Sequence, residues 1–532
     1  MANTNPYVVW AATPAGILAA VDAARQGAKV KLLEPSNNIG GVMTRGALCQ
    51  TDNEAEPAIN PGSDNSRWGL SKEVTEYWQA QVPGGTPKIK PTFKVAQDKF
   101  DSMIANEPNI TLVTGVDIQT PIRDGVTGRC TGFNTTIGVI AGDNWNDASY
   151  EGDMAYKLGC FTSMGRENSL AVNEITAGMR PPTKDLKPLA GQGPIGIDPL
   201  TGQRRKGIDP RPNQLPGMAD RRLMAFMTRT FMTRDPDGIK FATLNVNPDP
   251  ELYRADLEVL VANKETEMPA SPGEPLLPAA KIRPTDDHAI SYVDVNNGGL
   301  GPAGLNLING WNDWPNATWA QRFAMRDAYL IYKAGFLKTI CTNTEWASRL
   351  PELVADTKSW GLVPGLFTNS IIPGMSEAIY VRRMRRLVGQ AELVMQSWVG
   401  PEKNNVPEPV TMFGYPHIDA HWYQRYIGNA GRVLLEGGGG LNGGYGEAVS
   451  TLLPFGALKA RLTDCRNLMV SCVASGTMMG SINDRIELSW MRFGNVSGCA
   501  GGLAQLAGID TGALPYAMLR PALVARGSRL VH

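Results

Sequence analysis

The sequence has no excess of charge of either sign and no long apolar run. Its 532 residues contain 51 Lys and Arg against 51 Asp and Glu, so the formal net charge is zero. This balance argues against nucleic acid or an anionic membrane surface as the main partner. No segment approaches the roughly 18 consecutive apolar residues of a membrane helix, and the first residues lack the basic region of a secretory signal. We expect a soluble, cytoplasmic protein that binds neither nucleic acid nor membrane.

Paired cysteines and histidine-rich motifs are also missing. The seven cysteines are scattered and form no CxxC pair, which favours reduced thiols over a disulfide framework or a zinc site. Only four histidines occur, and two of them, His417 and His421, flank Asp419. On a strand, alternation would place these three side chains on one face, as a metal site with two histidines and one carboxylate requires. A structural histidine and a carboxylate–imidazole pair are the alternatives, and we predict no metal site.

What is present begins with a βαβ pattern. Residues 7–10 form a short apolar run, 17–26 are alanine-rich as in a helix, and 29–33 form a second apolar run that ends at Glu34. A strand, tight turn, helix and strand within about 30 residues indicate parallel strands joined by a right-handed crossover. Glu34 follows the turn at roughly the 20-residue spacing at which a carboxylate can accept the hydroxyls of an adenosine ribose. An ordinary solvated strand end is the alternative for Glu34.

The turn after the first strand is poor in glycine. The dinucleotide fingerprint places glycine at the positions of Ala11, Thr13 and Gly16, and only Gly16 is retained. Ala11 adds a methyl group at the tight turn, and Thr13 must hold its side chain away from a diphosphate. The amides of residues 12–16 would still face a phosphate at the helix N-terminus. The motif GQGPIG at 191–196 matches the fingerprint in letters only, since no strand precedes it and no helix follows, so we predict a loop there.

The sequence pattern predicts a largely helical middle part, followed by a strand and a helix at the end of the chain. Helices are predicted at 219–232, 253–264, 319–341, 345–359 and 375–398, and a closing strand and helix at 467–470 and 484–506. The helix at 375–398 would carry Arg382, Arg383, Arg385 and Arg386. We interpret these arginines as a solvated or salt-bridged helix face, with anion recognition as the alternative.

We therefore predict an α/β fold with a Rossmann-like, dinucleotide-binding domain and a central parallel sheet. This domain would be assembled from both chain ends, residues 1–165 and 429–532. Residues 166–428 would form an inserted α+β substrate or cap domain with a helical subregion at 319–398.

Several segments, taken in order, resemble one known family. They are VVWAATPAGILAAVDAARQGAKVKLLEPSNNIGGVMTRG at 8–46, DASYEGDMA at 147–155 with GREN at 165–168, DAHWYQRY at 419–426, and NLMVSCVASGTMMGSINDRIELSWMRFGNVSGCAGGLA at 467–504. Together they resemble the FAD-dependent oxidoreductases of the glutathione-reductase-like superfamily, in particular the bacterial group often labelled "xanthan lyase". That family usually has GGTPAG in the first turn, a glycine where Cys472 stands, and SIRMEP where this chain has SINDRIE. The resemblance runs over nearly the whole chain.

The resemblance implies FAD as the cofactor. Glu34 would accept the ribose hydroxyls, Val116 would contact the adenine through its backbone, and a glycine-containing loop would lead toward the flavin. The residues implied in cofactor binding are Ala11, Ala12, Thr13, Pro14, Ala15, Gly16, Glu34, Pro35, Gly40, Gly41, Thr44, Arg45, Val116, Ala148, Cys472 and Ile486.

The resemblance also covers Asp419 and His421 but not His417, which favours a pair in which the carboxylate orients the imidazole. Such a pair suits a general base, and Arg485 at the start of the closing helix would reinforce the helix dipole beside the flavin. A structural histidine and an ordinary salt bridge of Arg485 are the alternatives.

We expect a flavoenzyme that oxidises a small polar, hydroxylated substrate, with a carbohydrate-like molecule as one option, by hydride transfer to flavin N5. Dioxygen or an external acceptor would then take the electrons, and a homo-oligomer is compatible with the sequence. The rival hypothesis is a non-catalytic binding or structural subunit, derived from a flavoprotein, that holds FAD weakly or not at all. The altered phosphate turn at Ala11 and Thr13 motivates it.

Overall fold

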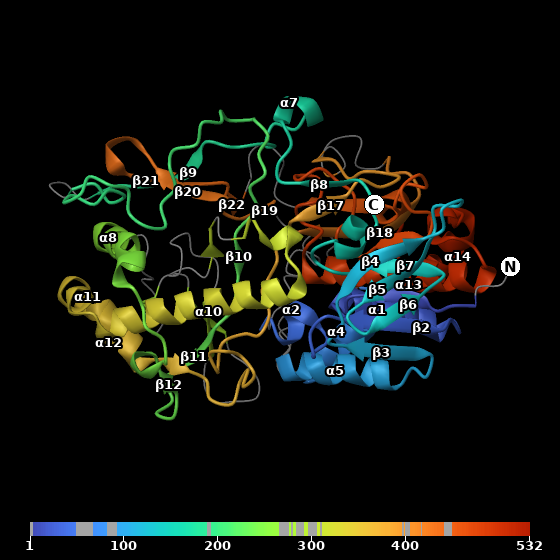
Figure 1. Ribbon diagram of the computed structural model, residues 1–532, viewed down its shortest axis with the longest axis horizontal. Helices are drawn as coiled ribbons and strands as arrows, with labels where there is room; N and C mark the ends of the chain where they lie inside the picture. The colour runs from blue at the N-terminus through green and yellow to red at the C-terminus, as the bar shows by residue number, and fades with distance from the viewer. Residues whose placement is uncertain are drawn as a thin grey trace.

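The computed structural model describes most of the chain. The described residues are 4–48, 67–81, 93–188, 193–264, 276–277, 280–283, 292–295, 306–308, 311–395, 398, 405–415, 418–440 and 449–531. The blue N-terminal and red C-terminal parts of the chain lie together on one side of the molecule, and the green and yellow middle part lies on the other (Figure 1).

The central element is a parallel sheet of five strands in the order β24-β7-β1-β2-β3. Its strands are β1 (Tyr7–Trp10), β2 (Val30–Glu34), β3 (Ile110–Thr114), β7 (Asn144–Asp147) and β24 (Leu468–Val470). The β1–β2 pair is parallel, and β24 joins the sheet through β7. The predicted βαβ unit is therefore confirmed, and one sheet contains strands from both ends of the chain.

Both faces of this sheet are buried. Along β1, Tyr7 and Val9 belong to the core cluster that contains the first helix, whereas Val8 and Trp10 belong to a second cluster on the opposite face. The second cluster lies under a three-stranded antiparallel sheet of β4 (Ile118–Arg123), β5 (Cys130–Thr135) and β6 (Gly138–Ala141). A strand buried on both sides reads as a continuous apolar run, which is why residues 7–10 show no alternation.

Two parallel helices cover the first face and join the chain ends. They are α1 (Pro14–Arg25) and α13 (Glu487–Ala507), predicted at 17–26 and 484–506. A Cβ at Gly494 would overlap the Ala15 carbonyl oxygen, and one at Gly498 would lie 2.5 Å from the Ala19 oxygen. The two helices therefore touch through backbone, without intervening side chains. The remaining helices of this half are α2 (Gly41–Thr44), α4 (Gly69–Gln81), α5 (Phe93–Ala105), α6 (Asp153–Lys157) and α14 (Tyr516–Ala525).

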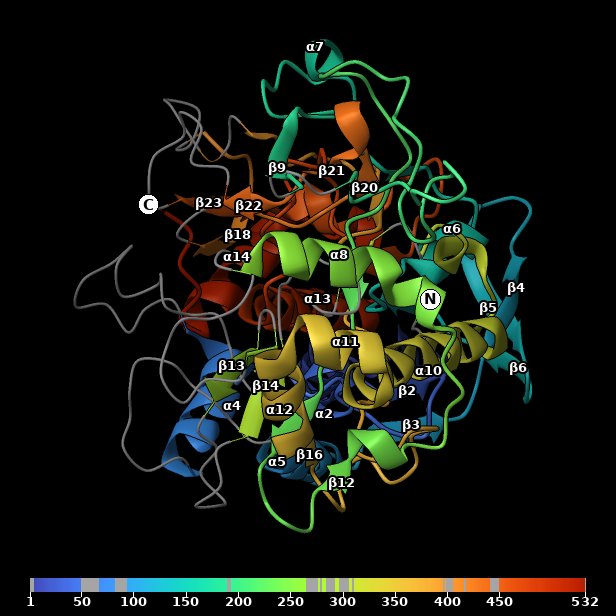
Figure 2. The ribbon, with the colours of Figure 1, turned by 90° about the vertical axis from the view of Figure 1, so that its left-hand side faces the viewer.

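The middle of the chain mixes short strands with helices that Figure 2 shows facing the viewer. Its helices are α7 (Ser169–Val172), α8 (Arg254–Ala262), α10 (Trp319–Thr342), α11 (Thr344–Arg349) and α12 (Pro351–Ser359). Its strands up to β17 are β8 (Thr162–Met164), β9 (Pro182–Leu186), β10 (Phe226–Met227), β11 (Phe231–Thr233), β12 (Ile239–Lys240), β13 (Ala280–Arg283), β14 (Tyr292–Val295), β15 (Asn306–Leu307), β16 (Gly361–Leu362) and β17 (Arg385–Leu387). The strands that follow are β18 (Pro409–Tyr415), β19 (Asp419–Ala420), β20 (Gln424–Ile427), β21 (Val433–Glu436), β22 (Gly439–Gly440) and β23 (Val449–Pro454).

Two of the five predicted helices in this part are wrong and one is divided. The helices predicted at 253–264 and 319–341 correspond to α8 and α10, but 345–359 is split because Pro351 starts a new helix. Residues 219–232 contain β10 and part of β11 instead of a helix, since these strands pair with β15, β14 and β16. Tertiary pairing has overridden the helical preference of their Met, Ala and Leu residues.

The arginine-rich segment is also not a helix. Residues 375–395 contain only β17 and irregular backbone, so the helical subregion predicted at 319–398 ends with α12. The four arginines are buried. Arg383 donates to the carbonyl oxygens of Cys472 and Ala474, and Arg386 donates to that of Gly476. The predicted helix and its solvated face are therefore wrong. The salt-bridged interpretation holds for two of the arginines, since Arg383 pairs with Asp484 at 2.8 Å and Arg386 pairs with Glu167.

Two further features concern the chain as described. None of its helices is both long and apolar enough to cross a membrane. Residues 193–196, the described part of the GQGPIG motif, form loop and turn rather than the start of a helix, as predicted.

The close approach of α1 and α13 predicts a sharp cost for a single methyl group. We expect Gly498→Ala to lower the free energy of unfolding by about 1–3 kcal/mol, although alanine normally favours a helix over glycine. Gly125→Ala is the control, because a Cβ there meets nothing within 4 Å. Chemical denaturation followed by circular dichroism measures both. Equal stability of the two variants would contradict backbone contact between the helices.

Candidate functional site

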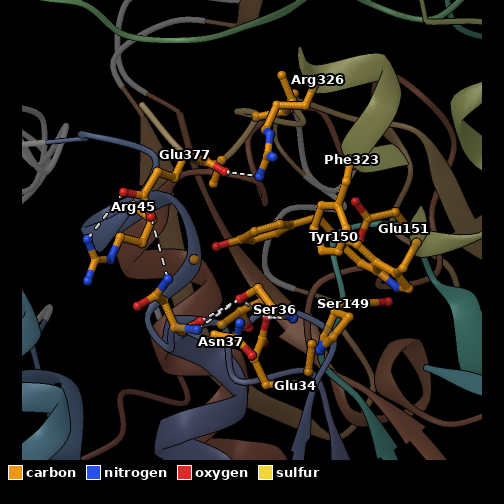
Figure 3. A pocket seen from close by; sticks show the side chains of 18 of the residues that line it. Glu34, Ser36, Asn37, Arg45, Ser149, Tyr150, Glu151, Phe323, Arg326 and Glu377 are labelled. Carbon is orange, nitrogen blue, oxygen red and sulfur yellow. Dashed lines mark hydrogen bonds and ion pairs between the residues drawn. The ribbon is translucent and has the colours of Figure 1, made fainter. Parts of the chain in front are cut away.

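A cavity of about 550 Å³ opens at the carboxyl ends of β1 and β2. Its volume lies within the range of roughly 300–1,000 Å³ usual for ligand pockets, and the carboxyl edge of a parallel sheet is where such folds bind nucleotides. Six of the predicted cofactor residues line it, namely Ala11, Thr13, Glu34, Pro35, Gly41 and Arg45. Figure 3 shows Glu34 and Ser36 on one wall and Phe323 and Arg326 on the wall across from them.

Glu34 is held by hydrogen bonds at the end of β2. Its carboxylate accepts from the Ala12 amide at 2.9 Å and from the Ser36 amide and hydroxyl at 3.0 and 2.6 Å. Burial raises the pKa of Glu34 to about 7, although all three donors oppose that change. A buried acceptor on the cavity wall is what a ribose hydroxyl requires, and a solvated strand end is excluded by its 8% exposure.

The first turn satisfies much of its own hydrogen-bonding capacity. The Thr13 hydroxyl caps α1 by accepting from the Gly16 amide at 3.2 Å, and donates to the Ala148 carbonyl oxygen at 2.8 Å. Pro14 has no amide hydrogen, and the Ala12 amide already donates to Glu34. The Thr13 side chain is thus turned into the protein, as predicted for a residue that must leave room for a diphosphate. A Cβ at Gly16 would overlap the Ala11 carbonyl oxygen, so the close approach of α1 to the turn requires glycine at this position.

The glycine-containing loop lies against the same turn. The Gly40 amide donates to the Ala12 carbonyl oxygen at 2.8 Å, and Gly40 and Gly41 both have positive φ values, +88° and +48°. A Cβ on Gly41 would lie 2.6 Å from the Tyr150 hydroxyl. The hydroxyl of Thr44 donates to the Ile39 carbonyl oxygen at 2.6 Å and so stabilises the loop from inside. These residues position Arg45 at the cavity.

The other predicted cofactor residues are not part of the cavity lining. They are Ala12, Pro14, Ala15, Gly16, Gly40, Thr44, Val116, Ala148, Cys472 and Ile486. Val116 is fully buried and its amide donates to the Glu34 carbonyl oxygen, while its neighbour Gly115 lines the cavity. The Cys472 thiol donates to the Ala148 carbonyl oxygen at 3.2 Å behind the turn. Burial raises the pKa of Cys472 well above its ordinary value, so this thiol is packed and protonated.

The predicted catalytic residues form a separate cluster at the start of α13, in which His421 and Arg485 are buried and Asp419 is partly buried. Arg485 contacts Asp419 through an ion pair of 2.5 Å and donates to the Tyr380 hydroxyl at 3.1 Å. His421 Nε2 lies 3.4 Å from Asp419 Oδ2, the same oxygen that Arg485 contacts. The structure therefore contains the predicted contact between His421 and Asp419. It also contains a salt bridge of Arg485, which is the alternative that the sequence left open for this residue. His417 lies outside the described residues.

The charges around His421 keep its imidazole neutral. Burial and the neighbouring Arg382 cation lower the pKa of His421 to about 3, against the opposing effect of Asp419. Burial alone would raise the pKa of Asp419, but His421 and Arg485 hold it well below its usual range. The cluster is thus an ionised carboxylate between a guanidinium and a neutral imidazole. Among the residues described, no group of three or more His, Cys, Asp or Glu side chains could hold a metal ion.

Tyr150 and residues 377–380 stand between this cluster and the cavity. The Tyr150 ring packs 4.5 Å from that of Trp490 on α13, and its hydroxyl accepts from the Val42 amide at 3.3 Å. Glu377, Ala378 and Ile379 line the cavity, and the next residue, Tyr380, donates to Glu487 in α13. The structure therefore brings Glu34, Thr13 and Arg45 together in one cavity, but not His421, Asp419 or Arg485.

Sequence reasoning missed the wall supplied by the middle of the chain. Trp314, Trp319, Phe323 and Arg326, with Glu377, line the cavity opposite the sheet. The density of Trp around residues 309–319 was the available signal, but it is equally compatible with core packing. Glu151 was also missed: it accepts from Trp314 Nε1 at 3.1 Å, and burial raises its pKa to about 7 despite the nearby Arg322.

The raised pKa of Glu34 predicts a pH dependence of stability. An unfolded glutamate loses its proton near pH 4.5, whereas the folded state keeps it to about pH 7, so folding stability declines as the pH rises through this window. We expect Glu34→Gln, in flavin-free protein, to gain stability relative to wild type by roughly 2–3 kcal/mol between pH 4.5 and 8. Urea unfolding at both pH values measures it, with the exposed Glu76→Gln as control. A pH-independent difference would disprove the burial effect.

Comparison with known proteins identifies the family of the chain. The sequence matches the family described as FAD dependent oxidoreductase over residues 7–523. No curated protein matches it. Among solved structures it is similar to THI4 of Thermovibrio ammonificans, at 18% identity over 32% of this chain and 70% of that one with a TM-score of 0.24. It is also similar to thioredoxin reductase of T. acidophilum, at 18% identity over 27% and 34% with a TM-score of 0.18. A third is L-proline dehydrogenase of P. horikoshii, at 13% identity over 31% and 59% with a TM-score of 0.22. Because the family match spans nearly the whole sequence, the chain belongs to the FAD-dependent oxidoreductases, whose cofactor is FAD.

Proposed function

We propose that the cavity holds the ADP half of FAD and that the enzyme oxidises a small polar, hydroxylated, carbohydrate-like substrate by hydride transfer to flavin N5. The observation that carries the first part is the position of Glu34 and Thr13 on one cavity at the carboxyl edge of the parallel sheet. The proposal includes the predicted division into a cofactor domain at 1–165 and 429–532 and a substrate domain at 166–428. Dioxygen or an external acceptor as oxidant, a cytoplasmic location and a homo-oligomer stay predictions.

The side chains on the cavity wall fit an adenosine diphosphate. Glu34 offers a buried acceptor for ribose hydroxyls, and the positive end of α1 begins at Thr13 on the same wall. Within the described part of the chain, the buried Arg45 Nε has no hydrogen-bond partner, so it has a donor left for a phosphate oxygen. An anion is therefore expected between Arg45 and the start of α1.

The proposed chemistry uses the cluster at the start of α13. When bound, FAD supplies the acceptor for two electrons and a proton. His421 directs Nε2 toward Asp419, which leaves Nδ1 to accept the proton of a substrate hydroxyl. Asp419 stabilises the imidazolium that results, and Arg485 keeps Asp419 ionised. The N-terminus of α13, which begins after Ile486 without a side-chain cap, stabilises negative charge placed before it.

A visible spectrum of the purified protein separates this function from its rival. We expect the absorption bands of oxidised flavin and one FAD bound per chain. The rival, a subunit that has lost FAD, is favoured only by the first turn, whose amides are already bonded to Glu34 and Thr13. A colourless protein whose spectrum added FAD does not restore would overturn the enzyme proposal.

The role of His421 is tested by flavin reduction. We expect His421→Ala to keep its FAD but to be reduced about 10²-fold more slowly under anaerobic conditions by the substrate found in a panel of alcohols, sugars and amines. We expect the lower end of the usual rate contribution of a general base, because an imidazole with a pKa of about 3 is a weak proton acceptor. For the same reason the wild-type rate should not fall as the pH is lowered from 8 to 5.

Flavin content is the internal control for this variant, since loss of FAD would slow reduction for another reason. Unchanged reduction kinetics in a variant that retains FAD would remove His421 from the mechanism. A wild-type rate that declines through a pKa near 6.5 would show that His421 titrates normally and that its charged neighbours do not act as described.

A further inference from the structure

Helix α10 presents one face to the cofactor cavity. Trp319, Phe323 and Arg326 line the cavity and follow one another at the i, i+4, i+7 spacing of a single helix face. Figure 3 shows Phe323 and Arg326 reaching toward the cavity from the side opposite Glu34. The helix belongs to the middle of the chain, which we predicted from the sequence to form the substrate domain rather than the cofactor domain.

The start of α10 is fastened to the cofactor half. Arg322 forms two contacts of 2.6 and 2.7 Å with the Asp153 carboxylate, and both groups are buried. Trp319 Nε1 donates to the same carboxylate at 3.1 Å, and the Trp319 amide donates to Asp117 at 3.4 Å. A capping box between Thr318 and Gln321 fixes the first turn. The position of this face relative to the sheet is therefore set by one buried ion pair, Arg322–Asp153, and by the hydrogen bonds of Trp319.

The order of side chains along the face follows the order of groups in an adenosine diphosphate. Trp319 lies beside Asp117, which follows Val116, the residue that the resemblance places at the adenine. Arg326 lies at the other end, where Nη1 donates to the Glu377 carbonyl oxygen at 2.8 Å and Arg45 is close to the Glu377 carboxylate. Seven residues of helix separate the two ends by roughly 10 Å.

The diphosphate needs ligands beyond the first turn. Two of the amides that usually face the phosphates, those of Ala12 and Gly16, donate to Glu34 and Thr13, and Pro14 has none. Arg45 shares its charge with Glu377, whose carboxylate is 3.5 Å away. Arg326 contacts Asp327 at 2.7 Å and the backbone of Glu377, which leaves some of its five N–H donors for a ligand.

We propose that α10 is the outer wall of the FAD site, in which Trp319 and Phe323 cover the adenosine and Arg326 binds the diphosphate. This inference rests on the proposed function, which places the ADP half of FAD in the cavity. Arg326 thus replaces, with a charge-assisted contact from the cap, the amide contacts that the glycine-poor turn does not offer.

The test is calorimetric titration of flavin-free, full-length protein with FAD, ADP and adenosine. We expect Arg326→Gln to weaken FAD and ADP at least about tenfold, as for one lost hydrogen bond to a charged group, and adenosine by less than about twofold. Arg326→Lys, which keeps the charge, should lie between. The control is Arg234→Gln, which removes the same charge from an ion pair with Asp356 away from the cavity.

Each result decides between the proposals. Equal ADP affinity of Arg326→Gln and wild type, with ADP binding intact, would overturn the role of Arg326 and leave the proposed function standing. Equal losses for ADP and adenosine would show that Arg326 only shapes the cavity, which also overturns it. Failure of wild-type protein to bind either FAD or ADP would overturn the proposed function and this inference together. Circular dichroism of each variant identifies a folding defect, and in that case Arg326→Lys decides.

Discussion

The backbone contact between α1 and α13 is the constraint on which the rest of the structure depends. Ala15 lies against Gly494 and Ala19 against Gly498, so the two helices run parallel and their N-termini point the same way. Because α1 begins at Pro14 and α13 at Glu487, α13 extends about six residues, or roughly 9 Å, beyond the start of α1. The positive ends of two helices are thereby staggered along one path. An extended cofactor with a diphosphate at one point and an electron-accepting ring farther on suits that stagger.

The parts of the fold that could be predicted are those whose signal is local. Residues 7–34 contain a strand, a capped helix and a strand in continuous sequence, and the position of Glu34 follows from their lengths. The pairing of Asp419 with His421 came from the resemblance. The ion pair between Asp419 and Arg485 was not predicted, since nothing local indicates that residues so far apart in sequence meet. Buried parallel strands at both chain ends were enough to indicate that one sheet uses both.

The sequence-based predictions that failed have a common physical cause. Arg382 and Arg386 look like a charged helix face, because the sequence gives no sign of the carbonyl oxygens they bind in other segments. Likewise Arg326 is unremarkable in sequence, as its relation to the cavity depends on the Arg322–Asp153 ion pair that fixes α10. Buried arginines satisfied by distant backbone are tertiary features, and patterns of period 3.6 cannot separate them from a solvated face.

The first turn shows how a dinucleotide site can lose glycines without losing the fold. Thr13 caps α1 and donates to Ala148, so the added side chain satisfies backbone groups rather than filling the cavity. The same bonds withdraw amides from a phosphate, and a hydrogen bond to a ligand must then compete with one already made inside the protein. Binding strength must therefore come from side chains around the cavity, above all from cations such as Arg45. A site built in this way depends on the cap as much as on the sheet, since the wall opposite Glu34 comes from α10. A cofactor bound there would consequently contact both the sheet and α10 and stabilise their association, which a glycine-rich turn alone would not require.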